Sequence, residues 1–267
     1  MLTRLDHLVI LVRDLDRAVR GYEGLGFAVT PGGEHADGLT RNTLIPFKDG
    51  SYLELVAFVD QEDPRDNVWG WRRFLSSGGG LIDYCAASDV LAADVGRLGE
   101  LDFGVDGPEG GGRRLPDGRE IRWLIARIRQ EGRLLPFLIE DLTPHDLRVP
   151  GGSSAEHPNG ALGIGNLKVA APEAEGALRA LATLTGSSGG IIVVHPSSPL
   201  GYHAALKSWY HRGGGALGRR GAMLTRLDHL VIQVRNLDRA VRGYEDLGVA
   251  VTPGGEHADG LTRNALI

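Results

Sequence analysis

The sequence lacks the features that would cross-link it, anchor it or suit it to a nucleic acid. It has one cysteine, Cys85, so no disulfide can form within the chain, and a reducing cytoplasm is the expected compartment. The net charge of -5 is opposite in sign to a nucleic-acid-binding surface. No apolar run is long enough to span a membrane, and charges within the strand-like N-terminus argue against a signal peptide. A nucleic acid and a membrane are therefore not expected as partners.

The composition is otherwise that of a globular protein with unusually many glycines. An apolar fraction of 42% is enough for a real core, and 267 residues correspond to one large or two modest domains. The chain has 40 glycines, and some of them occur in clusters at 78–80, 110–112 and 213–215. These clusters predict loops or linkers.

The first 45 residues occur twice. Residues 1–45 align without a gap to residues 223–267 and differ at only five positions. Structural repeats that share a fold through long divergence differ far more, so this identity indicates a recent duplication. The counterpart of Glu54 would fall beyond Ile267, so we expect the copy to lack a complete site. The sequence leaves open whether the copy is a passenger from a fused reading frame or competes with the first for the same place.

The first 60 residues predict a β-α-β-β-β module. Residues 6–12 form an apolar, β-branched run typical of a buried strand. Asp14 then stands at an N-cap position before residues with helical spacing, and Gly26 provides a C-terminal stop. Three further strands are expected at residues 27–30, 42–47 and 52–58, the last two around the turn Lys48-Asp49-Gly50.

The same order recurs with little sequence identity. A strand is expected at 81–87, a helix at 91–101, and strands at 121–128 and 134–140, with the glycine-rich stretch before them as a loop. A third β-α start follows, with a strand at 162–170 and a helix that begins at Pro172. Residues 187–222 show no clear pattern apart from a short strand at 191–194.

These motifs resemble the vicinal oxygen chelate superfamily of glyoxalases, epimerases, extradiol dioxygenases and bleomycin resistance proteins, and most closely its glyoxalase-like domain family. The resemblance is carried by LDHLVILVRDLDRAV, GGEHADGLTRNTLIPFKDGSYLEL, GGGLIDY, PFLIED and HPNGA. It implies an α+β fold of paired βαβββ modules at 1–145, with a third βα extension at 146–186. Residues 187–222 would be an irregular linker or junction, and 223–267 a truncated copy of the first module.

The resemblance also implies a metal site, because the superfamily takes its ligands from the first and last strands of each module. Residue by residue, His7 and Glu54 match in the first module and Glu140 matches in the second. The fourth position falls on Asp83 when the helices are aligned, or on Ile82 when the strand ends are aligned.

One imidazole with carboxylates suits a hard or borderline divalent ion such as Zn, Mn, Ni or Co. We expect His7, Glu54 and Glu140 to converge in one cavity, with the two glutamates available for proton transfer. Structural alternatives remain open: a hydrogen-bonded core histidine, a solvent-facing Glu54, a loop acid at Glu140 and a strand-start residue at Asp83.

His35 and Asn42 are candidate substrate contacts, because polar loop groups often bind ligands and the resemblance includes this loop. The alternative is a hairpin loop whose polar side chains satisfy the backbone. His157 precedes Asn159-Gly160 and is expected to be a turn residue.

Two functions from different classes fit these residues. The first is a metal-dependent lyase or isomerase that acts on a small carbonyl or enolisable substrate. The second is a metal-free small-molecule binding or resistance protein of the same fold. The resemblance leaves open whether the cavity closes within one chain or between the two chains of a homodimer.

Overall fold

The computed structural model describes one continuous body and several short segments beyond it. The body comprises residues 2–76, 78–115, 118–130 and 135–170, and the isolated parts are residues 184, 191–194, 201–208, 242, 252–256 and 263–266.

The first module has the predicted β-α-β-β-β order. Its elements are β1 (Leu2–Leu11), α1 (Leu15–Gly24), β2 (Thr30–Glu34), β3 (Thr40–Pro46) and β4 (Tyr52–Phe58). Helix α1 begins as expected, since the Asp14 carboxylate accepts a hydrogen bond from Arg17 N at 2.9 Å. It ends before Gly26, whose φ of +81° is readily adopted only by glycine.

The second module repeats the order, with one strand that the sequence interpretation placed in a loop. Its elements are β5 (Gly80–Ser88), α2 (Leu91–Glu100), β6 (Val105–Arg114), β7 (Glu120–Ile128) and β8 (Phe137–Asp141), preceded by the 3-10 turn η1 (Trp71–Leu75).

The expected glycine-rich loop is in fact strand β6. Its glycines allow a close approach to β7, because a Cβ at Gly111 would lie 2.3 Å from Trp123 Nε1. A larger residue at this position would displace the indole, so here glycine marks a tightly packed strand.

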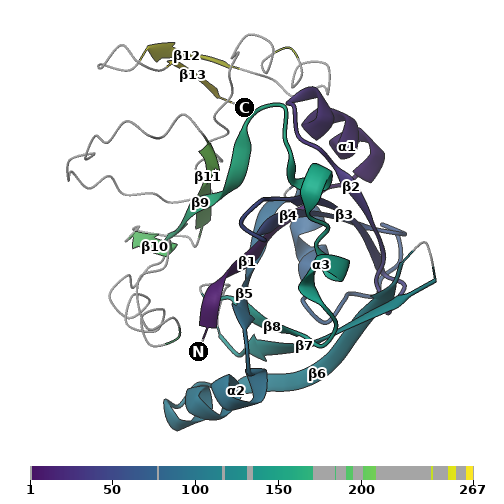
Figure 1. The fold of residues 1–267 in the computed structure, drawn as a ribbon, viewed down its shortest axis with the longest axis vertical. Helices are drawn as coiled ribbons and strands as arrows, with labels where there is room; N and C mark the ends of the chain where they lie inside the picture. Colours follow the sequence, from purple (N-terminus) through teal and green to yellow (C-terminus); the bar gives the residue numbers. More distant parts are fainter. Residues whose placement is uncertain are drawn as a thin grey trace.

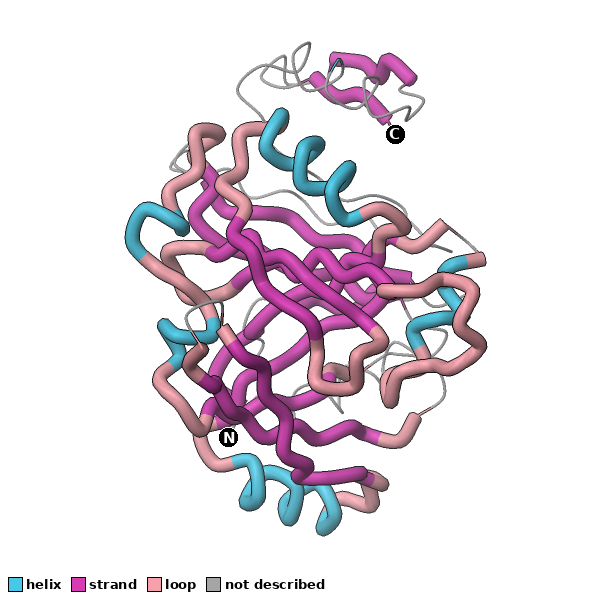
Figure 2. Tube along the Cα trace, turned by 90° about the vertical axis from the view of Figure 1, so that its right-hand side faces the viewer, coloured by secondary structure: helices cyan, strands magenta, loops and turns pink. Residues whose placement is uncertain are grey.

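The eight strands of the two modules form one mixed sheet in the order β2-β3-β4-β1-β5-β8-β7-β6. Strands β1 and β5 pair antiparallel at its centre, and each pairs in parallel with the last strand of its own module. The sheet curls until β2 and β6, at its two ends, approach each other (Figure 1). Helices α1 and α2 lie at opposite ends of this curled sheet (Figure 2). This is the expected α+β fold of paired modules.

Alternate residues of β1 face two different cores. Leu8 and Ile10 belong to a large cluster that includes residues of both helices. Val9 and Leu11 belong to a second cluster, which contains Trp71 and two residues of β8. Because side chains alternate along a strand, the sheet separates a helix-covered face from an inner face that holds the polar site described below.

A polar segment returns from the second module to the first, and we call this segment between β8 and β9 the strap. After β8 the chain forms α3 (His145–Arg148) and η2 (Gly152–Ala155) and then enters β9 (Ala161–Ala170). His157 on this strap is buried, so it is more than a turn residue. Its Nδ1 accepts from Ala28 N at 2.9 Å, and its Nε2 donates to Pro46 O at 2.8 Å.

Strand β9 belongs to this body, and the remaining described strands lie outside the residues that form it. Strand β9, which matches the predicted third strand, lies between β10 (Ile191–Val194) and β11 (Gly201–Ser208). The helix expected from Pro172 and most of the 187–222 linker lie outside the described residues. In the copy, β12 (Thr252–Glu256) and β13 (Arg263–Leu266) pair in the register of β2 and β3, shifted by the repeat offset.

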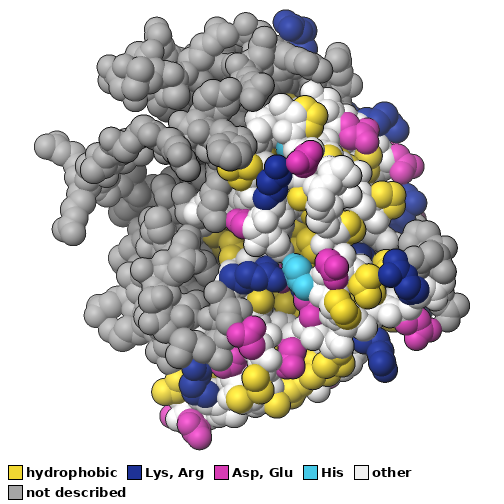
Figure 3. Space-filling model, in the orientation of Figure 1, with side chains coloured by type: hydrophobic (Ala, Val, Ile, Leu, Met, Phe, Trp, Pro, Cys, Tyr) yellow, Lys and Arg dark blue, Asp and Glu magenta, His cyan; other side chains and the backbone are white. Residues whose placement is uncertain are grey.

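The surface is mixed in character. Acidic, basic and apolar side chains are interspersed on the face that Figure 3 presents. Among the described residues, no helix combines the length and apolar character needed to cross a bilayer.

The strap generates a stability prediction. Replacing His157 with alanine leaves Ala28 N and Pro46 O without their buried partners, which should lower the free energy of unfolding by about 2–4 kcal/mol. The matched control is Glu156→Ala, which removes only an exposed ion pair with Lys48 and should cost under about 1 kcal/mol. Urea denaturation of both variants measures the difference, and equal losses would show that the strap contact contributes little.

Candidate functional site

The site begins at an irregularity in β1. Leu5 pairs with Ala86 and His7 with Cys85, so Asp6 is an extra residue without its own partner on β5. A bulge of this kind redirects side chains, and here Asp6 and His7 are both buried and in contact. His7 Nδ1 lies 2.7 Å from Asp6 Oδ1.

Glu54, on the inner face of β4, is the centre of the polar cluster. Its Oε2 lies 3.6 Å from His7 Nε2, and its Oε1 lies 3.4 Å from His35 Nε2. Asn42 donates from Nδ2 to Glu54 Oε1 at 2.6 Å. Gly32 makes room for this amide, because a Cβ there would lie 1.9 Å from Asn42 Oδ1. The structure thus brings four predicted site residues together, and we call His7, His35, Asn42 and Glu54 the Glu54 cluster.

The cluster is nearly closed to solvent. The side chains of His7 and Glu54 are 4% and 6% exposed, whereas that of His35 is 22% exposed. His35 is therefore the member of the cluster that is most accessible to solvent.

Glu54 is ionised despite its burial. Burial alone raises the pKa of this carboxyl, but hydrogen bonds from His35 and Asn42 and the charges of His35 and His7 outweigh it. Together they lower the pKa of Glu54 from 4.5 to about 2. A buried anion is therefore fixed between two imidazoles.

Both imidazoles are held at Nδ1 and turn Nε2 toward Glu54. For Asp6, burial raises the pKa, but the charge of Arg148 and the hydrogen bond from His7 hold it well below its usual range. An ionised Asp6 only accepts, so His7 Nδ1 carries the proton and donates. His35 Nδ1 lies 2.7 Å from Thr40 Oγ1. Ligating histidines in metalloproteins are commonly held at their second nitrogen in this way.

A buried arginine from the strap holds Asp6 in place. Arg148 donates to both Asp6 oxygens at 2.9 and 3.0 Å, to Tyr52 Oη at 3.0 Å, and to Asp141 from Nε and Nη2. Its guanidinium is thus paired with two carboxylates. The sequence interpretation missed Asp6 and Arg148, although an aspartate within an apolar strand was a signal for the first.

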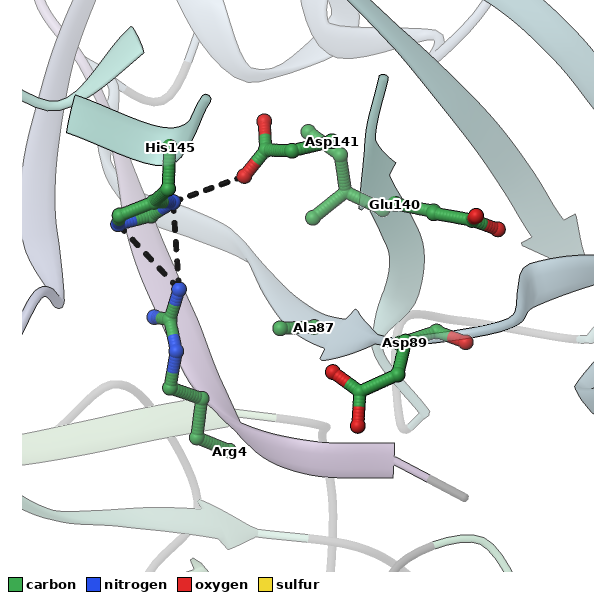
Figure 4. Close-up of a pocket in the computed structure, with 8 residues that line it drawn as sticks. Arg4, Ala87, Asp89, Glu140, Asp141 and His145 are labelled. Carbon is green, nitrogen blue, oxygen red and sulfur yellow. Dashed lines mark hydrogen bonds and ion pairs between the residues drawn. The ribbon is translucent and has the colours of Figure 1, made fainter. Parts of the chain in front are cut away.

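Asp83 and Glu140 do not join the Glu54 cluster. Asp83 is buried and accepts from Trp71 Nε1 at 2.9 Å. Glu140 accepts from Leu91 N at 2.6 Å and so caps helix α2. Figure 4 shows the Glu140 carboxylate pointing away from Asp141 and His145, which contact each other. The expected convergence of Glu140 with His7 and Glu54 is therefore not found.

The strand register explains this departure. Val9 lies six residues before α1 and Cys85 six before α2, so the two are equivalent. Val9 pairs with Glu54, whereas Cys85 pairs with Phe137. The second-module counterpart of Glu54 is thus Phe137, whose ring centroid lies 5.3 Å from that of His7 and 4.4 Å from that of Trp69.

Another group of possible ligands is chemically unsuited to a metal. In the described part of the chain, only Asp6, His7 and Cys85 form a set of three such side chains with all ligand atoms within 4.8 Å. Both oxygens of Asp6 are already bound by Arg148. Burial raises the pKa of the Cys85 thiol well above its usual value, so the thiolate that a metal requires is disfavoured.

A separate pocket of about 280 Å³ lies where the strap leaves β8. Figure 4 shows Arg4 and Asp141 both in contact with His145, with Asp89 and Glu140 nearby. Arg4 is ion-paired to Asp6, and Asp141 is ion-paired to Arg148. The pocket therefore borders the buried Asp6–Arg148 ion pair.

The curled sheet of paired βαβββ modules defines the vicinal oxygen chelate fold. The model of the family described as "Glyoxalase-like domain" matches residues 5–185 and, in the copy, 227–267. The chain therefore belongs to the glyoxalase-like domain family.

The chain is similar to solved structures at low sequence identity. A hypothetical protein from Staphylococcus aureus is 14% identical, with a TM-score of 0.59 over 75% of this chain and 91% of that one. Methylmalonyl-CoA epimerase from Mycobacterium tuberculosis is 23% identical, with a TM-score of 0.39 over 52% of this chain and 87% of that one. The Streptomyces coelicolor epimerase is 20% identical, with a TM-score of 0.38 over 54% and 100%. No curated protein matches the chain.

The depressed pKa of Glu54 predicts acid sensitivity. A carboxyl whose pKa is lower in the folded than in the unfolded state stabilises the fold above its unfolded pKa. This stabilisation is lost as the pH falls from about 4.5 to about 2. It amounts to about 3 kcal/mol, which Glu54→Gln should lack. Urea denaturation across this pH range measures it, and wild-type and variant curves of equal slope would contradict the assignment.

Proposed function

We propose that this chain is a metal-dependent lyase or isomerase that acts on a small carbonyl or enolisable substrate. The observation that supports it best is Glu54, a buried carboxylate flanked by two imidazoles whose Nδ1 atoms are held. Buried ionised groups with shifted pKa values are concentrated at catalytic sites.

The Glu54 cluster has a donor set that fits a divalent ion. Two imidazoles and one carboxylate suit iron, zinc and the other first-row divalent metals. Metal–ligand bonds of about 2.1 Å place neighbouring ligands about 3–3.5 Å apart. The contacts of His7 and His35 with Glu54, 3.6 and 3.4 Å, are close to this spacing, but the three ligand atoms do not all lie within 4.8 Å of one another, so a bound ion would have to draw the two imidazoles together. When bound, such an ion would stabilise negative charge that develops on a carbonyl oxygen. Asp83 and Glu140, already bound elsewhere, are not part of this proposed set.

Glu54 is the proposed proton carrier. With a pKa of about 2 it is a weak base, and this low value depends on hydrogen bonds from His35 and Asn42. A substrate that displaces Glu54 from the ion and takes over these hydrogen-bond donors would raise the pKa of Glu54 toward the range in which a carboxylate removes a proton from carbon. In an isomerase the proton then returns to a neighbouring atom of the substrate. His7, held by Asp6 at Nδ1, keeps Nε2 toward this carboxylate.

His35 and Asn42 are proposed to contact the substrate. His35 is the most exposed member of the cluster, and the Asn42 amide carries the donors closest to Glu54. A substrate oxygen that replaces Glu54 as the acceptor of the Asn42 amide would both orient the substrate and free the base.

A metal-free binding protein is the second candidate. It is favoured by the second module, where Phe137 stands at the position equivalent to Glu54 and packs against Trp69. Such a protein would bind its ligand with the same cluster but would neither contain a metal nor exchange protons.

Proton exchange tests the catalytic proposal. With hydroxyacetone in deuterium oxide, the wild-type protein should catalyse deuterium incorporation next to the carbonyl, as followed by NMR. Glu54→Gln should slow it about 100-fold or more, because the variant lacks the base. Glu140→Gln is the matched control, since this residue caps α2 outside the cluster and its variant should retain the activity. Equal rates in wild type and Glu54→Gln would overturn the role of Glu54.

Metal content tests the ligand set. Protein purified without a chelator should contain about one first-row divalent ion per chain, as measured by elemental analysis. His7→Gln, His35→Gln and Glu54→Gln should each lose it, and Glu140→Gln should retain it. An iron–sulfur cluster would contradict this ligand set, because the set contains no thiolate. A metal-free protein with intact ligand binding would favour the second candidate.

A further inference from the structure

Arg113 is a buried cation without an acidic partner. It lies on β6 and is 8% exposed. It donates from Nη2 to Arg148 O at 2.8 Å and from Nη1 to Asn42 Oδ1 at 3.5 Å. Its Nε is buried without a hydrogen-bond partner, and within the described ranges no carboxylate pairs with it. A guanidinium in this state is costly, because burial removes its hydration and the more distant charge of Glu54 does not outweigh that loss.

The neighbouring buried arginine shows how this fold otherwise satisfies such a group. Arg148 is paired with Asp6 and Asp141 and also contacts the Tyr52 hydroxyl. Burial lowers the pKa of Arg113, whereas the pKa of Arg148 is raised well above its usual value because its two carboxylates outweigh burial. The structure therefore contains one satisfied and one unsatisfied buried guanidinium side by side.

The position of Arg113 connects it to the Glu54 cluster. Strand β6 is the last strand of the sheet order, and the curl of the sheet brings it against the first module. The guanidinium thereby reaches Asn42, whose amide donates to Glu54. Only the Asn42 side chain would separate an anion bound to Arg113 from Glu54, the proposed base.

We propose that Arg113 binds an anionic group of the substrate, a carboxylate or a phosphate, and thus that the substrate is a small anionic carbonyl compound. This inference rests on the proposed function for the reaction, but the binding of the anion can be tested without it. Arg113 has free donors and a planar geometry that suit either oxyanion.

Two pairs of probes separate the charge from the rest of the ligand. Pyruvate is compared with methyl pyruvate, and dihydroxyacetone phosphate with dihydroxyacetone, by calorimetry in phosphate-free buffer. At least one anion should bind about tenfold or more tightly than its neutral partner. The pair that shows the preference identifies the carboxylate or the phosphate as the recognised group. No preference in either pair overturns the proposal.

Variants then assign the preference to Arg113. Arg113→Met should abolish it, and Arg113→Lys should retain part of it. Arg122→Met, which removes an exposed arginine from β7, changes the net charge equally and should leave it intact. Retention of the preference in Arg113→Met overturns the proposal.

Anion binding and deuterium exchange, measured on the same wild-type protein, separate this inference from the proposed function. If wild-type protein binds the anion through Arg113 but catalyses no deuterium exchange, the anion site stands and the catalytic proposal fails. If it exchanges deuterium into hydroxyacetone through Glu54 but shows no preference for an anion, the catalytic proposal stands and the role of Arg113 fails.

Discussion

The buried ion pair between Asp6 and Arg148 is the interaction on which the rest of the site depends. Asp6 occupies a bulge in the central strand and would be an uncompensated buried anion without the arginine. While ionised, it fixes the proton of His7 on Nδ1 and leaves Nε2 facing Glu54. Arg148, on the strap, therefore helps to determine which nitrogen of His7 carries the proton, although the two residues are far apart in the sequence.

The two modules share a fold but divide the chemistry unequally. All members of the Glu54 cluster come from the first module, and the equivalent inner face of the second is aromatic, with Phe137 in place of a carboxylate. The second module contributes a cation instead, since Arg113 crosses from β6 to Asn42. A symmetric fold thus supports an asymmetric site, with a buried carboxylate on one side and an unpaired guanidinium on the other.

Local patterns in the sequence were enough to predict most of the fold. Strand and helix periodicity and the Asp14 cap gave the two modules, and His7, His35, Asn42 and Glu54 were identified as candidates before the structure placed them together. Strand β6 was missed because glycine usually marks a loop, whereas here it admits the Trp123 indole. The exclusion of Glu140 depends on the register of β8, and the Arg148 contact depends on where the strap returns. Neither is encoded in local spacing.

The strap also has a consequence for the order in which the protein folds. The contact between Asp6 and Arg148 spans 142 positions, and that between Ala28 and His157 spans 129. Closing loops of this length costs more entropy than pairing neighbouring strands, and such contacts slow folding. On the ribosome, β1 is synthesised long before its arginine, so Asp6 remains hydrated until both modules have been made. The contacts of Arg148 that hold Asp6 therefore cannot form until both modules have been synthesised.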